Sequence, residues 1–318
     1  MAPRGKTCQK PVNYYLLRIA DSSQLSVIDI YNYTKRHMQA LKLSCADFTF
    51  PLLDHDKVID LIAMLDFKGI DIGLFSGRSH ITAETEFSDL INKARALRRK
   101  VEQRGMSITD VYLQLDNNLA KFAINHPEEN IRQYARAHFA KLMEYASESG
   151  ADHITCLPGM HFSGERIEDS VKRSYEELAW RVEQSKKYNL QFSVEVHTGS
   201  PFIIPNDAAA LLAAVPGLTL TLDYTHFIRN GYLPEDVHPL LGHTSHFHAR
   251  GATKNKLQAS VTENTIDYGD ILKRFKKINY DGWVGLEYIW IEWEQCNQVD
   301  TLSETIRLKT IIEQAYNQ

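Results

Sequence analysis

An acid and a histidine stand two residues apart near the middle of the chain, in the stretch Phe192–Gly199. Apolar and polar residues alternate through this stretch, which is typical of a β-strand. Side chains two positions apart in a strand point to the same face, so Glu195 and His197 can face one site. A solvent-facing edge strand would show the same alternation, so this stretch alone does not predict a site.

Three later stretches also have the pattern of a short strand, and each carries at its end residues that can bind a metal. They are Leu218–His226, Thr244–Gly251 and Trp283–Tyr288. One such ending is expected by chance, but four in succession predict a site. The candidate ligands, one from each stretch, are Glu195, Asp223, His248 and Glu287.

Strand and helix patterns alternate from Lys42 to the end of the chain. The predicted strands are residues 43–50, 69–75, 108–115, 151–157, 192–199, 218–226, 244–251 and 283–288. The predicted helices are residues 54–65, 88–104, 130–148, 174–189, 205–216, 235–241, 268–278 and 301–316. Helix starts are placed at two capping boxes, Ser174 with Glu177 and Thr301 with Glu304. Eight strands alternating with eight helices predict an α/β fold of the (β/α)8 TIM-barrel type.

A doubly wound open sheet is the alternative fold. It would require a glycine-rich phosphate turn after an early strand, and the sequence contains no G-x-G-x-x-G. We therefore predict a barrel over residues 41–318 and an N-terminal extension over residues 1–40, with a helix possible from Ser23 to Ala40.

Composition favours an enzyme that works on small molecules. The chain has 318 residues, a hydrophobic share of 43% and a formal charge of −4 without charged blocks, so neither nucleic acid nor a membrane is an expected partner. The four cysteines form no CxxC pair and predict reduced thiols in a cytoplasmic protein. We expect a homo-oligomer that acts on a small molecule.

In a barrel, the carboxyl ends of the strands converge on one mouth. Three carboxylates and an imidazole at that mouth suit Mn2+, Mg2+, Co2+ or Zn2+. Softer metals would require thiolates, and no cysteine is grouped with these residues.

Other residues near the predicted mouth have two interpretations. His246 is either a substrate contact or a satisfied core histidine. Trp290 belongs to a sugar-stacking wall, to the core or to a subunit interface. His161 lies in the glycine-rich loop 158–164, which the sequence predicts to be accessible to substrate.

The order Glu, Asp-x-x-His, His-x-His and a final Glu resembles the xylose isomerase-like superfamily. More narrowly, it resembles the sugar-phosphate isomerase/epimerase group, which includes ketose 3-epimerases and hydroxypyruvate isomerase. The resemblance covers Leu43 to Tyr316. It implies one divalent metal, with Mn2+ first among the candidates, bound by Glu195, Asp223, His248 and Glu287.

The resemblance also implies roles in the reaction. Glu195 and Glu287 would move protons on opposite faces of the substrate, and His226 would contact the substrate. Arg250 is the nearest match to a substrate-binding arginine, although its spacing differs from that of the epimerases. The pair Glu195-x-His197 departs from the epimerase pattern and predicts an additional acid or base.

The resemblance implies a metal-dependent isomerase or epimerase that removes a proton next to a carbonyl group of a sugar or keto-sugar, and the metal site predicted from the residues fits this chemistry. A metal-dependent lyase, either a dehydratase or an eliminating deglycosidase of a keto-sugar or 3-keto-glycoside, is the alternative, and His197 as an acid would suit it. An abasic-site endonuclease would require histidines after the seventh strand, and none follows His248. A non-enzymatic binding barrel is the remaining possibility.

Overall fold

The computed structural model describes residues 40–318. The extension predicted over residues 1–40, with its helix from Ser23, lies outside the described residues except for Ala40.

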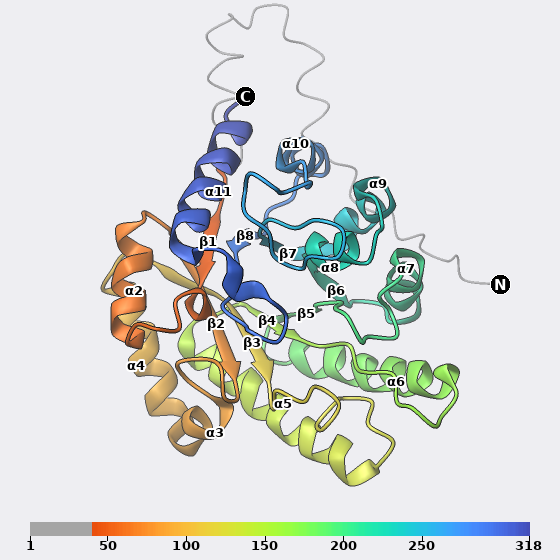
Figure 1. Cartoon of the computed structure of the whole chain (residues 1–318). Coiled ribbons are helices and arrows are strands. Elements are labelled where there is room, and N and C mark those ends of the chain that lie inside the picture. Colours follow the sequence, from red (N-terminus) through yellow and green to blue (C-terminus); the bar gives the residue numbers. More distant parts are fainter. Residues whose placement is uncertain (1–39) are drawn as a thin grey trace, which may run out of the picture. The chain divides into compact units, whose positions relative to one another are not determined.

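Eight parallel strands close into a barrel in chain order (Figure 1). They are β1 Leu43–Ala46, β2 Gly69–Phe75, β3 Ser107–Gln114, β4 His153–Cys156, β5 Gln191–Val194, β6 Thr219–Asp223, β7 Thr244–Ala249 and β8 Trp283–Leu286. The barrel is closed by β8 and β1, where Leu43 pairs with Val284. The predicted (β/α)8 barrel is confirmed.

Helices surround this barrel (Figure 1). The longer ones are α2 His55–Met64, α4 Leu90–Glu102, α5 Glu129–Ser149, α6 Ile167–Lys186, α7 Pro205–Ala214, α10 Tyr268–Ile278 and α11 Thr301–Tyr316. Three short helices, α3 Ala83–Glu86, α8 Tyr224–Arg229 and α9 Pro234–Val237, lie in the connections. Within residues 40–318, no helix combines the length and apolar character needed to cross a membrane.

The two predicted capping boxes are wrong. Helix α6 begins at Ile167, so Ser174 lies inside it, and Glu177 forms an ion pair of 2.7 Å with Arg181 instead of capping. At the start of α11 the side chain of Asp300, one residue before Thr301, accepts a hydrogen bond from the Ser303 N–H. The pair predicted to cap α6 thus lies within that helix, where Glu177 belongs to a buried ion pair. In α11 the capping residue is the one that precedes the predicted pair.

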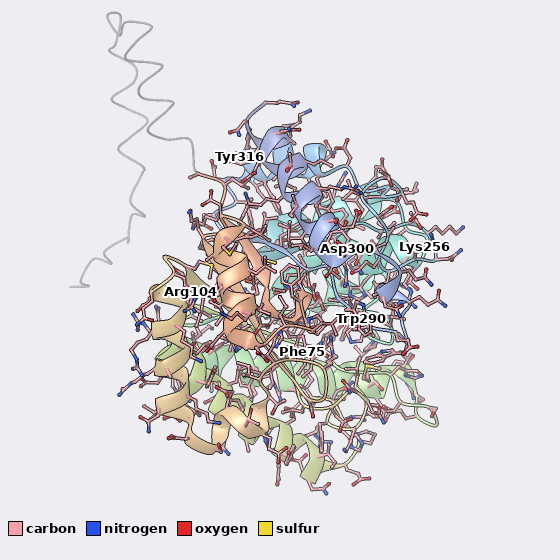
Figure 2. All side chains as sticks on the ribbon, turned by 60° about the vertical axis from the view of Figure 1, so that its left-hand side comes forward. Phe75, Arg104, Lys256, Trp290, Asp300 and Tyr316 are labelled. Carbon is pink, nitrogen blue, oxygen red and sulfur yellow. The ribbon has the colours of Figure 1, made fainter. Side chains whose placement is uncertain are left out.

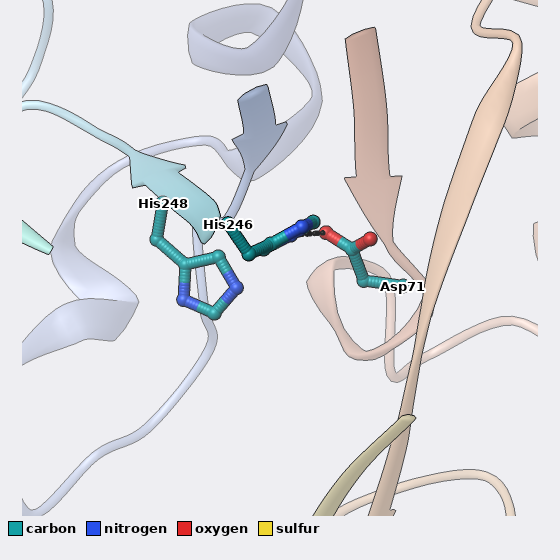
Figure 3. A group of neighbouring side chains, drawn as sticks. All are labelled: Asp71, His246 and His248. Carbon is teal, nitrogen blue, oxygen red and sulfur yellow. Dashed lines mark hydrogen bonds and ion pairs between the residues drawn. The ribbon is translucent and has the colours of Figure 1, made fainter. Parts of the chain in front are cut away.

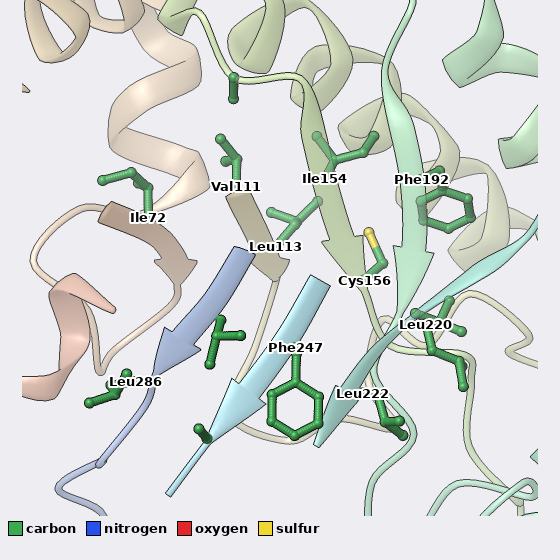
Figure 4. Packing of buried hydrophobic residues seen from close by; sticks show 14 of the residues in the cluster. Ile72, Val111, Leu113, Ile154, Cys156, Phe192, Leu220, Leu222, Phe247 and Leu286 are labelled. Carbon is green, nitrogen blue, oxygen red and sulfur yellow. The ribbon is translucent and has the colours of Figure 1, made fainter. Parts of the chain in front are cut away.

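The hydrophobic core lies on the outer face of the barrel, between strands and helices (Figure 4). Alternate strand residues point outward into it and are buried, for example Ile72, Val111, Ile154, Leu220 and Phe247. Burying these side chains is the main stabilising contribution that the helices make, because apolar burial is worth about 25 cal/mol per Å2.

The inward-facing residues are mostly polar, and hydrogen bonds join them across strands. The hydroxyl of Thr155 lies 2.7 Å from that of Thr221, and Ser193 and Thr221 are joined in the same way. His153 bridges Asp110 at 2.7 Å and Ser245 at 2.8 Å. Buried polar groups without partners would each cost about 1–3 kcal/mol, so this network is what permits a polar barrel interior.

A buried pair, Asp71 and His246, lies inside the barrel against Gly285. The Asp71 Oδ2 atom is 3.1 Å from His246 Nε2 and also accepts a hydrogen bond of 3.0 Å from Ser44. A Cβ atom at Gly285 would lie 2.2 Å from that Asp71 oxygen. The absence of a side chain on β8 therefore makes room for the pair.

We expect Gly285→Ala to lower the free energy of unfolding by about 1–3 kcal/mol, because overpacking a filled interior forces side chains and backbone to shift. The matched control is Gly242→Ala, since a Cβ atom there meets nothing within 4 Å. Urea denaturation of both variants tests this expectation. Equal stability of the two would contradict it.

Candidate metal centre

Four acidic and imidazole side chains meet at the carboxyl ends of β5 to β8. Glu195 and Glu287 each follow the last residue of a strand, Asp223 ends β6, and His248 lies near the end of β7. All four are at most 5% exposed. The side chains that the sequence predicts as ligands are thus buried at one end of the barrel.

One imidazole nitrogen of His248 is shared between two carboxylates. Its Nδ1 atom lies 2.8 Å from Glu195 Oε1 and 2.8 Å from Glu287 Oε2. A single N–H can point at only one of them, and it donates to Glu195. Glu287 Oε2 is consequently a buried oxygen without a hydrogen bond.

This donor set fits a divalent cation. Donor atoms of Glu195, His248 and Glu287 lie within 4.8 Å of one another. An ion between them would satisfy both carboxylates at once, which the single N–H cannot do. Carboxylate and imidazole donors together suit Mn2+, Mg2+, Co2+ and Zn2+.

Asp223 belongs to a second, overlapping group. Its donor atom lies within 4.8 Å of those of Glu195 and His226. It also accepts hydrogen bonds of 2.7 Å from Arg250 and 2.8 Å from the backbone of Thr225. Glu195 joins the two groups, and Arg250 holds Asp223 beside them.

Burial and mutual charge control protonation here. Burial and the nearby Glu287 raise the pKa of Glu195. Burial alone would lower the pKa of His248, but Glu287 and Glu195 outweigh it and hold that pKa well above its usual value. Burial would raise the pKa of Asp223, yet Arg250 and His226 keep it below the usual range. The metal-free centre therefore binds protons on Glu195 and His248 more tightly than water-exposed groups do.

His246 lies inside the barrel beside His248 and points to Asp71 (Figure 3). It also lines a cavity with Lys42 and Trp283, residues at the amino ends of β1 and β8 and so at the end of the barrel opposite the mouth. Its position is that of a hydrogen-bonded interior residue beneath the candidate centre.

An open cleft of about 130 Å3 leads to the centre. Of the residues predicted from the sequence, it is lined by Glu195, His197, His226 and Arg250. His161 is exposed on its loop. Trp290, labelled in Figure 2, is 45% exposed. The aromatic residue that lines the cleft is Trp293.

His197 presents a hydrogen-bond acceptor at this cleft. Its Nδ1 lies against the carbonyl oxygen of Thr198, which can only accept, so Nδ1 carries the proton. Burial lowers the pKa of His197 to about 4, which keeps the ring neutral. The Nε2 lone pair is buried without a partner among the described residues.

Sequence reasoning missed three residues of the site. The Tyr112 hydroxyl donates a hydrogen bond of 2.7 Å to Glu195 Oε2. Gln114 and Arg78 line the cleft. The alternation of Asp110, Tyr112 and Gln114 along β3 was an available signal, because it places all three on one face.

A family model described as "Xylose isomerase-like TIM barrel" matches residues 59–309. No curated protein matches the chain in sequence. Among solved structures, a D-psicose 3-epimerase from Clostridium cellulolyticum H10 is similar, with a TM-score of 0.68 and 14% identity over 87% of this chain and 99% of that one.

Two further solved structures extend the comparison. A 3-keto-D-glucoside 4-epimerase from E. coli has a TM-score of 0.66 and 14% identity, covering 86% of this chain and 100% of its own. A probable 3-DHS dehydratase from Bacillus anthracis has a TM-score of 0.64 and 15% identity, covering 85% and 99%. At these identities the likeness shows a shared fold.

We expect the Mn2+-loaded chain to hold one ion, and Glu287→Ala and Asp223→Ala to weaken its binding by about 100-fold or more, since each removes a donor. Elemental analysis after dialysis measures the content. Glu294→Ala is the matched control, because Glu294 lines the same cleft but pairs with Arg229. Full occupancy in the Glu287 and Asp223 variants would exclude this ligand set.

Metal binding should release protons near neutral pH. Glu287 and Glu195 hold the pKa of His248 well above its usual value, so its imidazole is protonated there, and a metal ion must displace that proton. Affinity should therefore fall as pH falls. Calorimetry in two buffers of different ionisation enthalpy measures the release, and identical heats in both would contradict it.

Proposed function

The chain belongs to the xylose isomerase-like TIM-barrel family, and from that premise we propose that it is a divalent-metal-dependent isomerase or epimerase of a sugar or keto-sugar. The observation that carries the proposal is the pair of buried carboxylates, Glu195 and Glu287, which both lie 2.8 Å from the same ring nitrogen of His248 at the barrel mouth.

A divalent ion held by Glu195, Asp223, His248 and Glu287 would polarise a substrate carbonyl and stabilise the negative charge that develops when a neighbouring carbon loses a proton. We place Mn2+ first among the candidate ions because the donors are mainly oxygen with one imidazole.

Glu195 is the proposed base that removes this proton. It lines the cleft, so its carboxylate can reach the reacting carbon of a bound substrate. Tyr112 donates to one of its oxygens and thereby fixes the orientation of the carboxylate. Glu287 is the proposed acid that returns a proton from another direction.

His197 and His226 would orient the substrate. The unprotonated Nε2 of His197 can accept a hydrogen bond from a sugar hydroxyl. His226 Nδ1 is also buried without a partner in the described part of the chain. Holding hydroxyl groups in this way places the reacting carbon near Glu195.

The similar structures support sugar chemistry, since two of those named are epimerases of a ketose and of a 3-keto-glucoside. The dehydratase among them keeps a lyase as the alternative. Elimination would require an acid near the leaving group, and His197 is neutral with its free nitrogen unprotonated. This observation argues against His197 as the acid of an elimination.

The test is a panel of ketoses and 3-keto-glycosides incubated in D2O with the Mn2+-loaded chain. Deuterium should enter at the carbon next to the carbonyl as the isomer or epimer forms. An unsaturated or cleaved product would instead establish the lyase, and no reaction across the panel would count against both.

Glu195→Gln and Glu287→Gln should each lower kcat by about 100-fold or more, because an amide keeps the shape but cannot transfer a proton. Both residues are proposed ligands, so metal content is measured first and only metal-loaded samples are compared. A metal-loaded Glu287→Gln variant with normal turnover would leave Glu287 as a ligand only.

A further inference from the structure

We propose that the substrate carries a carboxylate and that Arg78 binds it. The inference deepens the proposed function and rests on it, since it concerns the same cleft and names a class of substrate: sugar acids or keto acids rather than neutral ketoses.

Arg78 follows β2 and lines the cleft together with Glu195 and His226. Its guanidinium carbon lies 4.1 Å from the centre of the Phe75 ring. One of its nitrogens donates to the side-chain oxygen of Gln114. Both partners are neutral, so they orient the guanidinium without neutralising its charge.

Other cations near the mouth are already paired. Arg250 lies 2.7 Å from Asp223, and Arg229 lies 3.2 Å from Glu294. Among residues 40–318, Arg78 has no carboxylate within the 4.0 Å of an ion pair. It is thus a half-buried guanidinium without a direct ion pair among the described residues, and the carboxylates of Glu287, Glu294 and Glu195 act on its charge only from beyond that distance.

The positive charge of Arg78 is in excess of the negative charge that the carboxylates of the centre supply. With a divalent ion bound, the carboxylates of Glu195, Asp223 and Glu287 would be balanced by that ion together with Arg250, which already pairs with Asp223. A partly buried cation is costly unless an anion accompanies it. The missing anion is a single negative charge, which matches one carboxylate.

The geometry of the donor also favours a carboxylate. A guanidinium presents a planar fork of N–H groups that matches both oxygens of a carboxylate. Phosphate sites usually gather several donors, often at a helix N-terminus. In the described residues, this cleft offers one unpaired guanidinium.

Arg78 is also fixed relative to the proposed base. The Phe75 ring beneath it contacts Tyr112 edge-on, with 5.0 Å between ring centres. The Tyr112 hydroxyl in turn donates to Glu195. This packed series sets the position of the guanidinium against that of the carboxylate, so a substrate anchored at Arg78 meets Glu195 at a defined distance.

Three acids with one shared chelating group test the proposal. Glycerate, malate and 3-phosphoglycerate all carry an α-hydroxycarboxylate for the metal, and differ in a neutral, carboxylate or phosphate tail. Their binding to the Mn2+-loaded full chain is measured by calorimetry, with Arg78→Gln, Arg78→Lys and the exposed Arg99→Gln as variants.

Malate should bind about 10- to 100-fold more tightly than glycerate to the unmodified chain, as expected for a charge-assisted hydrogen bond. That advantage should vanish in Arg78→Gln, return in part in Arg78→Lys and persist in Arg99→Gln. Glycerate should bind equally to all four proteins, because its only carboxylate belongs to the α-hydroxycarboxylate that chelates the metal ion.

Each contrary outcome has a separate meaning. Equal binding of the three acids, with metal in place, overturns the role of Arg78 and leaves the metal centre intact. Tightest binding by 3-phosphoglycerate that depends on Arg78 overturns the carboxylate and assigns a phosphate ester. If even glycerate fails to bind, or no metal is retained, the proposed function fails and this inference with it.

Discussion

One ring nitrogen of His248 faces two buried carboxylates, and the candidate centre is organised around that contact. With water excluded, a single N–H cannot satisfy both, so the arrangement is stabilised by an added proton or by a metal ion. The barrel makes the contact possible, because the register of β7 and β8 pairs His248 with Gly285, two residues before Glu287. The pairing of β7 with β8 is therefore part of the closed barrel and also positions His248 near Glu287.

The barrel interior supports this centre from below. Outward residues pack against helices, while inward ones form a hydrogen-bonded polar column that includes Asp71 and His246. Gly285 leaves the space that this pair occupies. A polar column is rigid only while its groups remain paired, so substitutions deep in the barrel should act on the mouth through packing.

Strand ends and loops contribute different parts of the candidate site. The proposed ligands come from the ends of β5 to β8, whereas Arg78 and Trp293 come from the segments after β2 and β8. Loops can vary while the strand ends remain fixed by the barrel. We therefore assign reaction type to the strand ends and the choice of substrate to the loops.

Periodicity in the sequence predicted the strand count, the missing glycine-rich phosphate turn favoured the closed barrel over an open sheet, and the residues that end four strands predicted which side chains meet at one end. The bounds of β2 and α10 match their predicted ranges. What it did not provide were contacts between distant segments: Tyr112 with Glu195, 83 positions apart, and His246 with Asp71, 175 apart. The tautomer of His197 and the unpaired charge of Arg78 also depend on neighbours in space. Alternation along a strand shows which face a side chain takes, but closure of the barrel decides what it meets there.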